Sequence, residues 1–262
     1  MFFDSHCHID FAEFDEDRIE VLRRASESGV NALLIPGVSP MQWPHAEQIS
    51  MACREAGFLS CRAIGLHPWW IDNDYANQDG LTELLTGHLD DDVVAIGECG
   101  LDALRETPMS IQIEVLWVHI QIAKDKNLPL ILHCVKAHEL LLDILAQANL
   151  PMGGVVHGFG GSYETALRYW HLGFVIGVGA MATRPHTRHA KRAFTELPIE
   201  ALLLETDSPA MPIWRDCEDW SKQRNEPANI QIVASALANL RGISISELAK
   251  QCRVNTQKMF GV

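Results

Sequence analysis

The sequence predicts an α/β fold: a (β/α)8 TIM barrel with extra helices at its C-terminal end. Short apolar runs rich in β-branched residues alternate eight times with helical patterns. The strand-like runs are continuous stretches of Ile, Val and Leu, as in parallel sheets buried on both faces. A length of 262 residues suits one large barrel. We therefore predict a single barrel domain over residues 1–262, with an open doubly wound sheet as the competing topology.

The predicted strands and helices alternate along most of the chain. The expected strands are residues 2–9, 31–38, 59–66, 93–97, 129–134, 154–159, 174–178 and 201–205. Apolar residues three or four positions apart predict helices around 19–25, 111–122 and 140–145, and Gly29 is placed to end the first of them. A long loop from 205 to about 227 precedes two further helical segments near 230–240 and 246–252.

The charge balance limits how the protein can hold a polyanion. Acidic residues outnumber basic ones by 34 to 21, which gives a formal net charge of −13. This balance argues against a protein that binds duplex DNA through phosphate neutralisation alone. It does not exclude an enzyme that acts on nucleic acid, because a bound metal ion supplies positive charge locally.

The expected location is the cytoplasm. No apolar run approaches the roughly 18 residues that a membrane span needs, and no basic segment precedes an apolar one at the N-terminus, as it would in a secretory signal. The seven cysteines form no C-x-x-C pair and lie far apart in a chain large enough to build its own core. A disulfide framework is therefore not expected, and a reducing compartment fits better.

Polar residues able to bind metal follow most of the predicted strands. They are His6, His8, His67, Glu98, His133, His157 and Asp207. In a parallel barrel the carboxyl ends of the strands meet at one face, where active sites form. A His or a carboxylate after a buried apolar run is costly to desolvate unless something pairs with it. The repetition at one relative position therefore predicts a shared site.

Strand alternation separates the histidines from the neighbouring cysteines. His6 and His8 should point to the same side of their strand, and Cys7 to the opposite side. Cys99 and Cys134 each lie one residue from Glu98 and His133, so they should also point away from these candidate ligands. We expect these cysteines to pack as small apolar side chains. Imidazoles and carboxylates together suit Zn²⁺ or Mn²⁺ better than Ca²⁺. The set is large enough for two divalent ions per chain, with Zn²⁺, Mn²⁺ and Mg²⁺ all left open and a carboxylate as bridge.

The ordered set of motifs resembles the TatD family of metal-dependent deoxyribonucleases, within the amidohydrolase-like barrel superfamily. The motifs are Asp4-Ser5-His6-Cys7-His8, Gly65-Leu66-His67-Pro68, Gly97-Glu98-Cys99-Gly100-Leu101-Asp102, His133, His157-Gly158-Phe159, Glu205-Thr206-Asp207-Ser208-Pro209 and Asn225-Glu226-Pro227. The resemblance implies divalent-metal hydrolysis of DNA, often from the 3′ end of single strands. It implies that one ion is bound by His6, His8 and Asp207, that a second is bound by His133 and His157, and that Glu98 bridges them.

The sequence departs from the family pattern at two positions. Ala103 stands where the family usually has an aromatic residue, and Val135 stands where it usually has an arginine two residues after the strand-five histidine. Neither change removes a metal ligand. The second removes a candidate phosphate contact and so bears on the substrate.

We expect a divalent-metal-dependent hydrolase, foremost a phosphodiesterase that acts on DNA in the manner of a 3′-5′ exodeoxyribonuclease through a metal-activated water. Asp207 is the expected proton acceptor, and Glu98 is the expected bridge between the two metal ions. His67 either positions substrate, donates a proton or braces its loop. One alternative is an amidohydrolase-type enzyme acting on a small amide, lactone or aminoacyl ester. Another is a non-catalytic metal-binding protein, although structural zinc sites are usually closed and cysteine-rich.

Two groups of residues are candidates for contacts with substrate. Residues 183–192 form the main basic cluster after the seventh strand, where barrels often bind phosphate, although helical spacing also fits a solvated helix face. Trp69, Trp70, Trp214 and Trp220 either stack unpaired bases or anchor loops. We expect single-stranded DNA or a small phosphodiester as substrate, no membrane or obligate protein partner, and a monomer or weak oligomer. Surface or helix-packing roles are expected for His45, His88, His119, His138 and His171.

Overall fold

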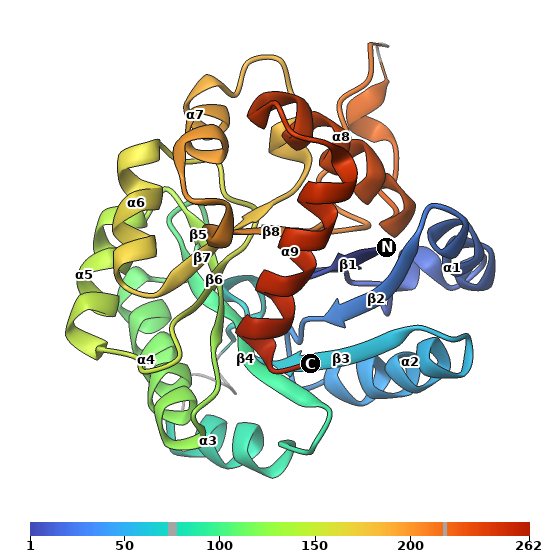
Figure 1. Ribbon diagram of the computed structural model, residues 1–262. Coiled ribbons are helices and arrows are strands. Elements are labelled where there is room, and N and C mark those ends of the chain that lie inside the picture. Colours follow the sequence, from blue (N-terminus) through green and yellow to red (C-terminus); the bar gives the residue numbers. More distant parts are fainter. Residues whose placement is uncertain (73–77, 217–218) are drawn as a thin grey trace.

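The computed structural model describes residues 1–72, 78–216 and 219–262 (Figure 1). Eight strands form one parallel sheet in sequential order. They are β1 Phe2–Asp4, β2 Val30–Ile35, β3 Leu59–Ile64, β4 Val93–Asp102, β5 Leu130–Val135, β6 Gly154–Val156, β7 Phe174–Val178 and β8 Leu202–Leu204. The Ser5 backbone N–H donates to the Leu204 carbonyl over 3.0 Å, which joins the end of β1 to β8 and closes the sheet. The barrel is thus confirmed over the doubly wound alternative.

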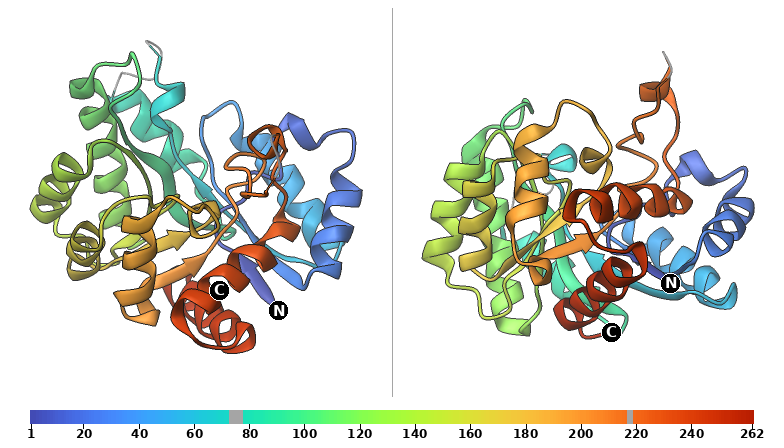
Figure 2. Two further views of the ribbon diagram at one scale, coloured as in Figure 1. Left: turned by 90° about the horizontal axis from the view of Figure 1, so that it is seen from above. Right: turned by 45° about the horizontal axis from the view of Figure 1, so that its top comes forward.

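Helices pack around the outside of this sheet, as Figure 2 shows from two further directions. They are α1 Arg18–Glu27, α2 Trp43–Glu55, α3 Gln78–Gly87, α4 Met109–Lys126, α5 His138–Ala148, α6 Tyr163–His171, α7 Arg188–Glu196, α8 Ile230–Arg241 and α9 Ile245–Phe260. The short 3-10 turns are η1 Ala12–Phe14, η2 Pro68–Trp70, η3 Ala180–Ala182, η4 Ile199–Ala201, η5 Trp220–Lys222 and η6 Pro227–Asn229. In the described ranges no single helix is long and apolar enough to cross a membrane. The bent pair Pro227–Arg241 and Ile245–Phe260 reaches the required length and apolar character only when its two helices are taken together.

Alternating side chains of the strands fill the inside of the barrel. Every strand contributes to this inner cluster, with Phe3, Ala32, Leu34, Cys61, Ala63, Ala95, Ile131, Val155, Val175 and Leu203. Phe260 of α9 joins the same cluster, and Asn255 of α9 donates to the carbonyl of Leu202 at the start of β8. The C-terminal helix, which crosses the barrel in Figure 1, therefore covers the amino ends of the strands. The carboxyl ends at the opposite face are left for the functional site.

Most predicted strands were off by one to three residues at one or both ends, and the two largest errors, of five residues each, affect the site. β1 ends at Asp4 rather than at residue 9, because the chain then leaves the ladder and the His8 N–H donates to the Ser208 carbonyl over 2.8 Å. β4 continues to Asp102 instead of ending at residue 97, because it pairs with β5 along its second half. Gly100 permits this pairing at a φ of 141°, since a Cβ there would lie 2.0 Å from the His133 carbonyl oxygen. β7 begins and ends as predicted.

Candidate metal centre

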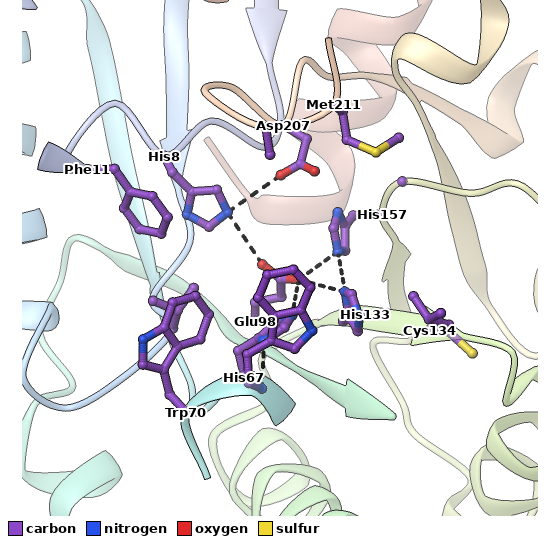
Figure 3. Close-up of a pocket in the computed structure, with 15 residues that line it drawn as sticks. His8, Phe11, His67, Trp70, Glu98, His133, Cys134, His157, Asp207 and Met211 are labelled. Carbon is purple, nitrogen blue, oxygen red and sulfur yellow. Dashed lines mark hydrogen bonds and ion pairs between the residues drawn. The ribbon is translucent and has the colours of Figure 1, made fainter. Parts of the chain in front are cut away.

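A cavity of about 390 Å³ opens at the carboxyl ends of the strands (Figure 3). Its walls carry His8, Phe11, Val38, His67, Trp69, Trp70, Glu98, His133, Cys134, Val135, His157, Gly158, Asp207, Ala210 and Met211. Figure 3 shows the labelled histidines and carboxylates pointing toward one another at the bottom of this cavity. His6 is fully buried, and its Nε2 atom lies 3.2 Å from both His8 Nε2 and Glu98 Oε2. The predicted site residues are therefore brought to one place.

The first half of the cluster joins β1 to the loop after β8. His6 Nε2 and His8 Nε2 lie 3.2 Å apart, and each is 3.6 Å from Asp207 Oδ1. The backbone fixes this meeting, because the Asp207 N–H donates to the His6 carbonyl over 2.8 Å. Asp207 has a φ of 57°, a left-handed conformation that costs energy outside glycine and that Asp tolerates better than most residues.

Glu98 connects this half to a second group of histidines. Its Oε2 atom lies 3.2 Å from His6 Nε2 and 3.5 Å from His8 Nε2. Its Oε1 atom faces His157 Nε2 at 2.6 Å, His67 Nε2 at 3.2 Å and His133 Nδ1 at 3.3 Å. Each of the two oxygens of this buried carboxylate therefore lies next to a different set of imidazoles.

The donor set fits divalent cations. Two Nε2 atoms at 3.2 Å can share at most one proton when both imidazoles are neutral, and the nearest other atoms are carboxylate oxygens. A cation satisfies all of these lone pairs at once, and imidazole nitrogen with carboxylate oxygen is the ligand chemistry of Zn²⁺ and related ions. Within the part of the chain that the structure describes, three triads suited to a metal are His6–His8–Asp207, His6–Glu98–His157 and His67–Glu98–His133.

The electrostatics hold Glu98 in its anionic form. Burial alone would raise its pKa, but His157, His67 and His6 keep the pKa of this carboxyl well below its usual value. Burial would likewise lower the pKa of His157, yet Glu98 raises it to about 10. Burial lowers the pKa of His67 to about 4. His157, whose Nε2 lies 2.6 Å from Glu98 Oε1, is therefore strongly coupled to the Glu98 charge.

The His67 ring is fixed in one tautomer. Its Nδ1 accepts a hydrogen bond from the Trp69 N–H over 3.0 Å. The Nε2 atom of this neutral ring must then carry the proton, and it lies 3.2 Å from Glu98 Oε1. His67 is thus in direct contact with the Glu98 carboxylate, closer to the centre than its place in the sequence indicated.

Asp102 is a site residue to which sequence reasoning gave no role. Its Oδ2 lies 3.3 Å from His133 Nε2 and accepts from Trp69 Nε1 over 2.8 Å. On the other side of the same ring, His133 Nδ1 lies 3.3 Å from Glu98 Oε1 and 3.2 Å from His157 Nε2. Burial would raise the pKa of Asp102, but the hydrogen bonds from His133 and Trp69 keep it well below the usual value. The signal was present, because residues 98, 100 and 102 share one face of an extended strand.

A polar network supports the Asp207 loop from inside the barrel. Asp4 accepts hydrogen bonds from both the backbone and the hydroxyl of Thr206, at 2.9 and 2.6 Å. Asn225 donates to the Thr206 carbonyl over 2.8 Å, which gives the Asn-Glu-Pro motif a structural role. Glu205 accepts from the Gly158 N–H over 2.6 Å, and burial raises its pKa to about 8. Glu205 therefore ties the segment after His157 to β8.

The aromatic and cysteine predictions have mixed outcomes. Trp69 and Trp70 line the cavity with exposed fractions of 52% and 38%. Trp214 and Trp220 are not among its lining residues, and Trp220 lies under Arg184.

Cys7 and Cys99 are buried among apolar side chains as expected, whereas Cys134 packs on the core and also reaches the cavity wall. The six described cysteines are free, and Cys217 lies outside the described residues.

The basic cluster and the remaining histidines lie apart from the cavity walls. Within residues 183–192, Arg192 pairs with Glu164 and Glu196, as on a solvated helix face. His119 is fully buried in α4, which is the helix-packing alternative of the two roles expected for it. Its Nε2 accepts from the Leu66 N–H over 2.9 Å, next to His67, so it braces the end of β3 from behind.

A closed parallel barrel with imidazoles and carboxylates gathered at the carboxyl ends of its strands defines the class of metal-dependent barrel hydrolases. The family model described as TatD related DNase matches residues 3–261. The uncharacterized metal-dependent hydrolase YjjV of Escherichia coli (strain K12) is 34% identical, with 100% of this chain and 98% of YjjV covered. The crystal structure of YjjV superposes with a TM-score of 0.88 over the same shares of the two chains.

A further relative carries a named activity. The 3′-5′ ssDNA/RNA exonuclease TatD of Pantoea ananatis is 31% identical over 99% of both chains. This chain therefore belongs to the TatD family and is a metal-dependent hydrolase of that family. The resemblance to the TatD family that the motifs indicated is confirmed.

Proposed function

We propose that this hydrolase cleaves phosphodiester bonds of single-stranded DNA from the 3′ end. The observation that carries the proposal is the position of Glu98, whose two oxygens face two groups of imidazoles. A carboxylate between two cation sites is the arrangement used for two-metal phosphodiester hydrolysis. The TatD relatives named as 3′-5′ ssDNA/RNA exonucleases give the substrate class.

The ligand assignment follows the two halves of the cluster. His6, His8 and Asp207 would hold one ion, His133 and His157 the second, with Glu98 between them. We favour Zn²⁺ or Mn²⁺ over Mg²⁺ because the set is rich in imidazole nitrogen. Bound ions would supply an activated water and would neutralise charge on the phosphate.

The protein side chains then orient and move protons. Asp207 lines the cavity, and its Oδ1 faces both His6 and His8, so it is the carboxylate placed to accept a proton from the attacking water. His67 holds its Nε2 proton toward Glu98 and so orients that carboxylate at the cavity wall. Phe11 and Trp70, with ring centroids 6.4 Å apart, offer faces on which a terminal base can stack.

A second candidate function is hydrolysis of a small uncharged ester or amide. Val135, Cys134 and Met211 make part of the cavity wall apolar, and Val135 stands where the family usually has an arginine. Such a wall suits an uncharged group at least as well as a phosphate.

One experiment separates the two functions. Protein of known metal content, measured by elemental analysis, is incubated with single strands labelled at either end and with a panel of amides, lactones and aminoacyl esters. Progressive shortening of 5′-labelled strands supports the nuclease. Turnover of the neutral panel without any DNA cleavage overturns it. We also propose a cytoplasmic protein acting as a monomer or weak oligomer, which cell fractionation and light scattering test.

A further inference from the structure

The rim of the cavity carries an arginine stacked on an aromatic ring. Arg105, in the segment between β4 and α4, places its guanidinium carbon 4.8 Å from the centre of the Trp69 ring. Trp69 itself lines the cavity. This cation–π contact holds the guanidinium beside the indole, and in the described part of the chain no side-chain hydrogen bond occupies its N–H groups, which are therefore available to an anion.

A second cation lies on the same side of the cavity. The Ala103 N–H donates to the Val135 carbonyl over 3.0 Å, which ties the segment carrying Arg105 to the end of β5. Lys136 follows Val135 directly and is exposed. Among the described residues neither Arg105 nor Lys136 forms an ion pair, whereas arginines such as Arg192 are paired. Because the chain has a net charge of −13, unpaired cations beside the cavity indicate a place where an anion can bind.

The hollow beyond Phe11 and Trp70 has the reverse charge. Phe11 and Trp70 border a second hollow of about 450 Å³, whose walls include Asp10 and Glu13. Asp10 is buried, and its Oδ1 has no hydrogen-bond partner among the described residues. A phosphate on that side would face carboxylates, so the path of a polyanion is asymmetric.

We propose that Arg105 on Trp69, with Lys136 beside it, binds the phosphate next to the scissile bond and directs the rest of the strand across the β4–β5 side. The inference rests on the proposed phosphodiesterase function and names the residues that recognise the polyanionic substrate. Arg105 and Lys136 thereby supply the cationic phosphate ligand that the apolar side chain of Val135 cannot provide.

Binding of a cleavage-resistant probe tests the inference without turnover. The probe is a fluorescent, phosphorothioate-linked oligothymidylate added to the metal-loaded protein, and anisotropy is followed over a series of salt concentrations. Arg105→Gln should weaken binding roughly tenfold at low salt and reduce the slope of log Kd against log salt by about 0.7. Lys136→Gln should act in the same direction with a smaller effect, and Arg105→Lys should recover part of the loss.

A matched control changes the same net charge at the other end of the barrel. Lys126 ends α4 just before β5 begins, and Lys126→Gln should bind the probe as the parent does. Parent-like affinity and salt slope in Arg105→Gln overturn the inference. Hydrolysis of bis(4-nitrophenyl) phosphate by the parent is measured separately, because its absence counts against the phosphodiesterase function while the binding data still report on Arg105.

Discussion

Asp102 lies 3.3 Å from His133 Nε2, on the side of the imidazole away from Glu98. A carboxylate behind a metal-facing histidine fixes the tautomer of the ring and raises its basicity. The pair therefore connects the end of β4 to the candidate metal centre.

Removing the charge of Asp102 should weaken metal binding. Asp102→Asn keeps the shape of the side chain but takes the anionic partner from His133, and loss of such a partner costs about 10–100-fold in metal affinity. Competition with a chromophoric chelator measures the affinity. Asp143→Asn, an exposed change on α5, is the control and should bind metal as the parent does. Equal affinity for Asp102→Asn and the parent would contradict the role.

Asp207 should be needed for turnover more than for folding. Asp207→Asn leaves a neutral amide where the proton acceptor stood, and loss of general base catalysis costs about 10²–10⁴-fold in rate. The measurement is kcat with metal content determined on the same sample. Undiminished turnover at unchanged metal content would remove Asp207 from the chemistry.

Two substitutions of Trp69 separate its two contacts. Trp69→Phe keeps an aromatic face but lacks the N–H that donates to Asp102, so it should affect metal affinity more than strand binding. Trp69→Ala removes the face as well and should cost an additional 1–3 kcal/mol, roughly, in binding of a single strand. Anisotropy titrations of both variants check this order. Strand binding by Trp69→Ala at parent strength would dismiss stacking.

His119 should make the protein sensitive to acid through its burial. Burial lowers the pKa of His119 to about 4 from the ordinary 6.5, so the unfolded chain takes up the proton first as the pH falls. The free energy of unfolding should therefore decrease between pH 6.5 and about 4 and level off, as far as this residue contributes. Above pH 6.5 both states hold the ring neutral, and the contribution is constant.

A variant of His119 isolates this contribution. His119→Leu leaves the buried Leu66 N–H without its acceptor and should cost about 1–3 kcal/mol at pH 7.5. The difference between the two proteins should shrink as the pH falls. Urea unfolding of metal-free protein at several pH values measures it, and a difference that does not change with pH would refute the assignment.

Gly177 should tolerate no side chain. A Cβ at this position would lie 2.1 Å from Glu205 Oε2, inside a packed barrel where the carboxyl group cannot move away freely. Gly177→Ala should lower the free energy of unfolding by about 1–3 kcal/mol. Gly179→Ala is the matched change, since the nearest Glu205 atom there is 3.4 Å away. Equal thermal midpoints for the two variants would contradict the prediction.

The fold and the position of the candidate metal centre could be predicted from the sequence for a simple physical reason. Parallel strands with buried faces read as apolar runs, and their carboxyl ends converge, so polar residues such as His133 and His157 after those runs had to meet. The contact of Asp102 with His133 and Trp69 depends on the register of β4 against β5, which composition does not specify. Residues 1–262 as one domain and a cytoplasmic location remain predictions.

The burial of His119 could not be read from its helix. α4 has an exposed face with Glu114 and Gln121, but its buried side is broad and includes the polar Gln112 beside Val115, so residue type alone does not place His119 on one side or the other. The early end of β1 was hidden for a related reason, because residues 5–9 remain buried after leaving the ladder.

His6 comes from the segment just after the first strand and Asp207 from the loop after the last one, and they meet only across the seam of the closed barrel. During translation the ribosome therefore releases the second of these groups long after the first. A nascent chain carries an incomplete centre until β8 docks beside β1, so the enzyme stays inactive until synthesis of its barrel is finished.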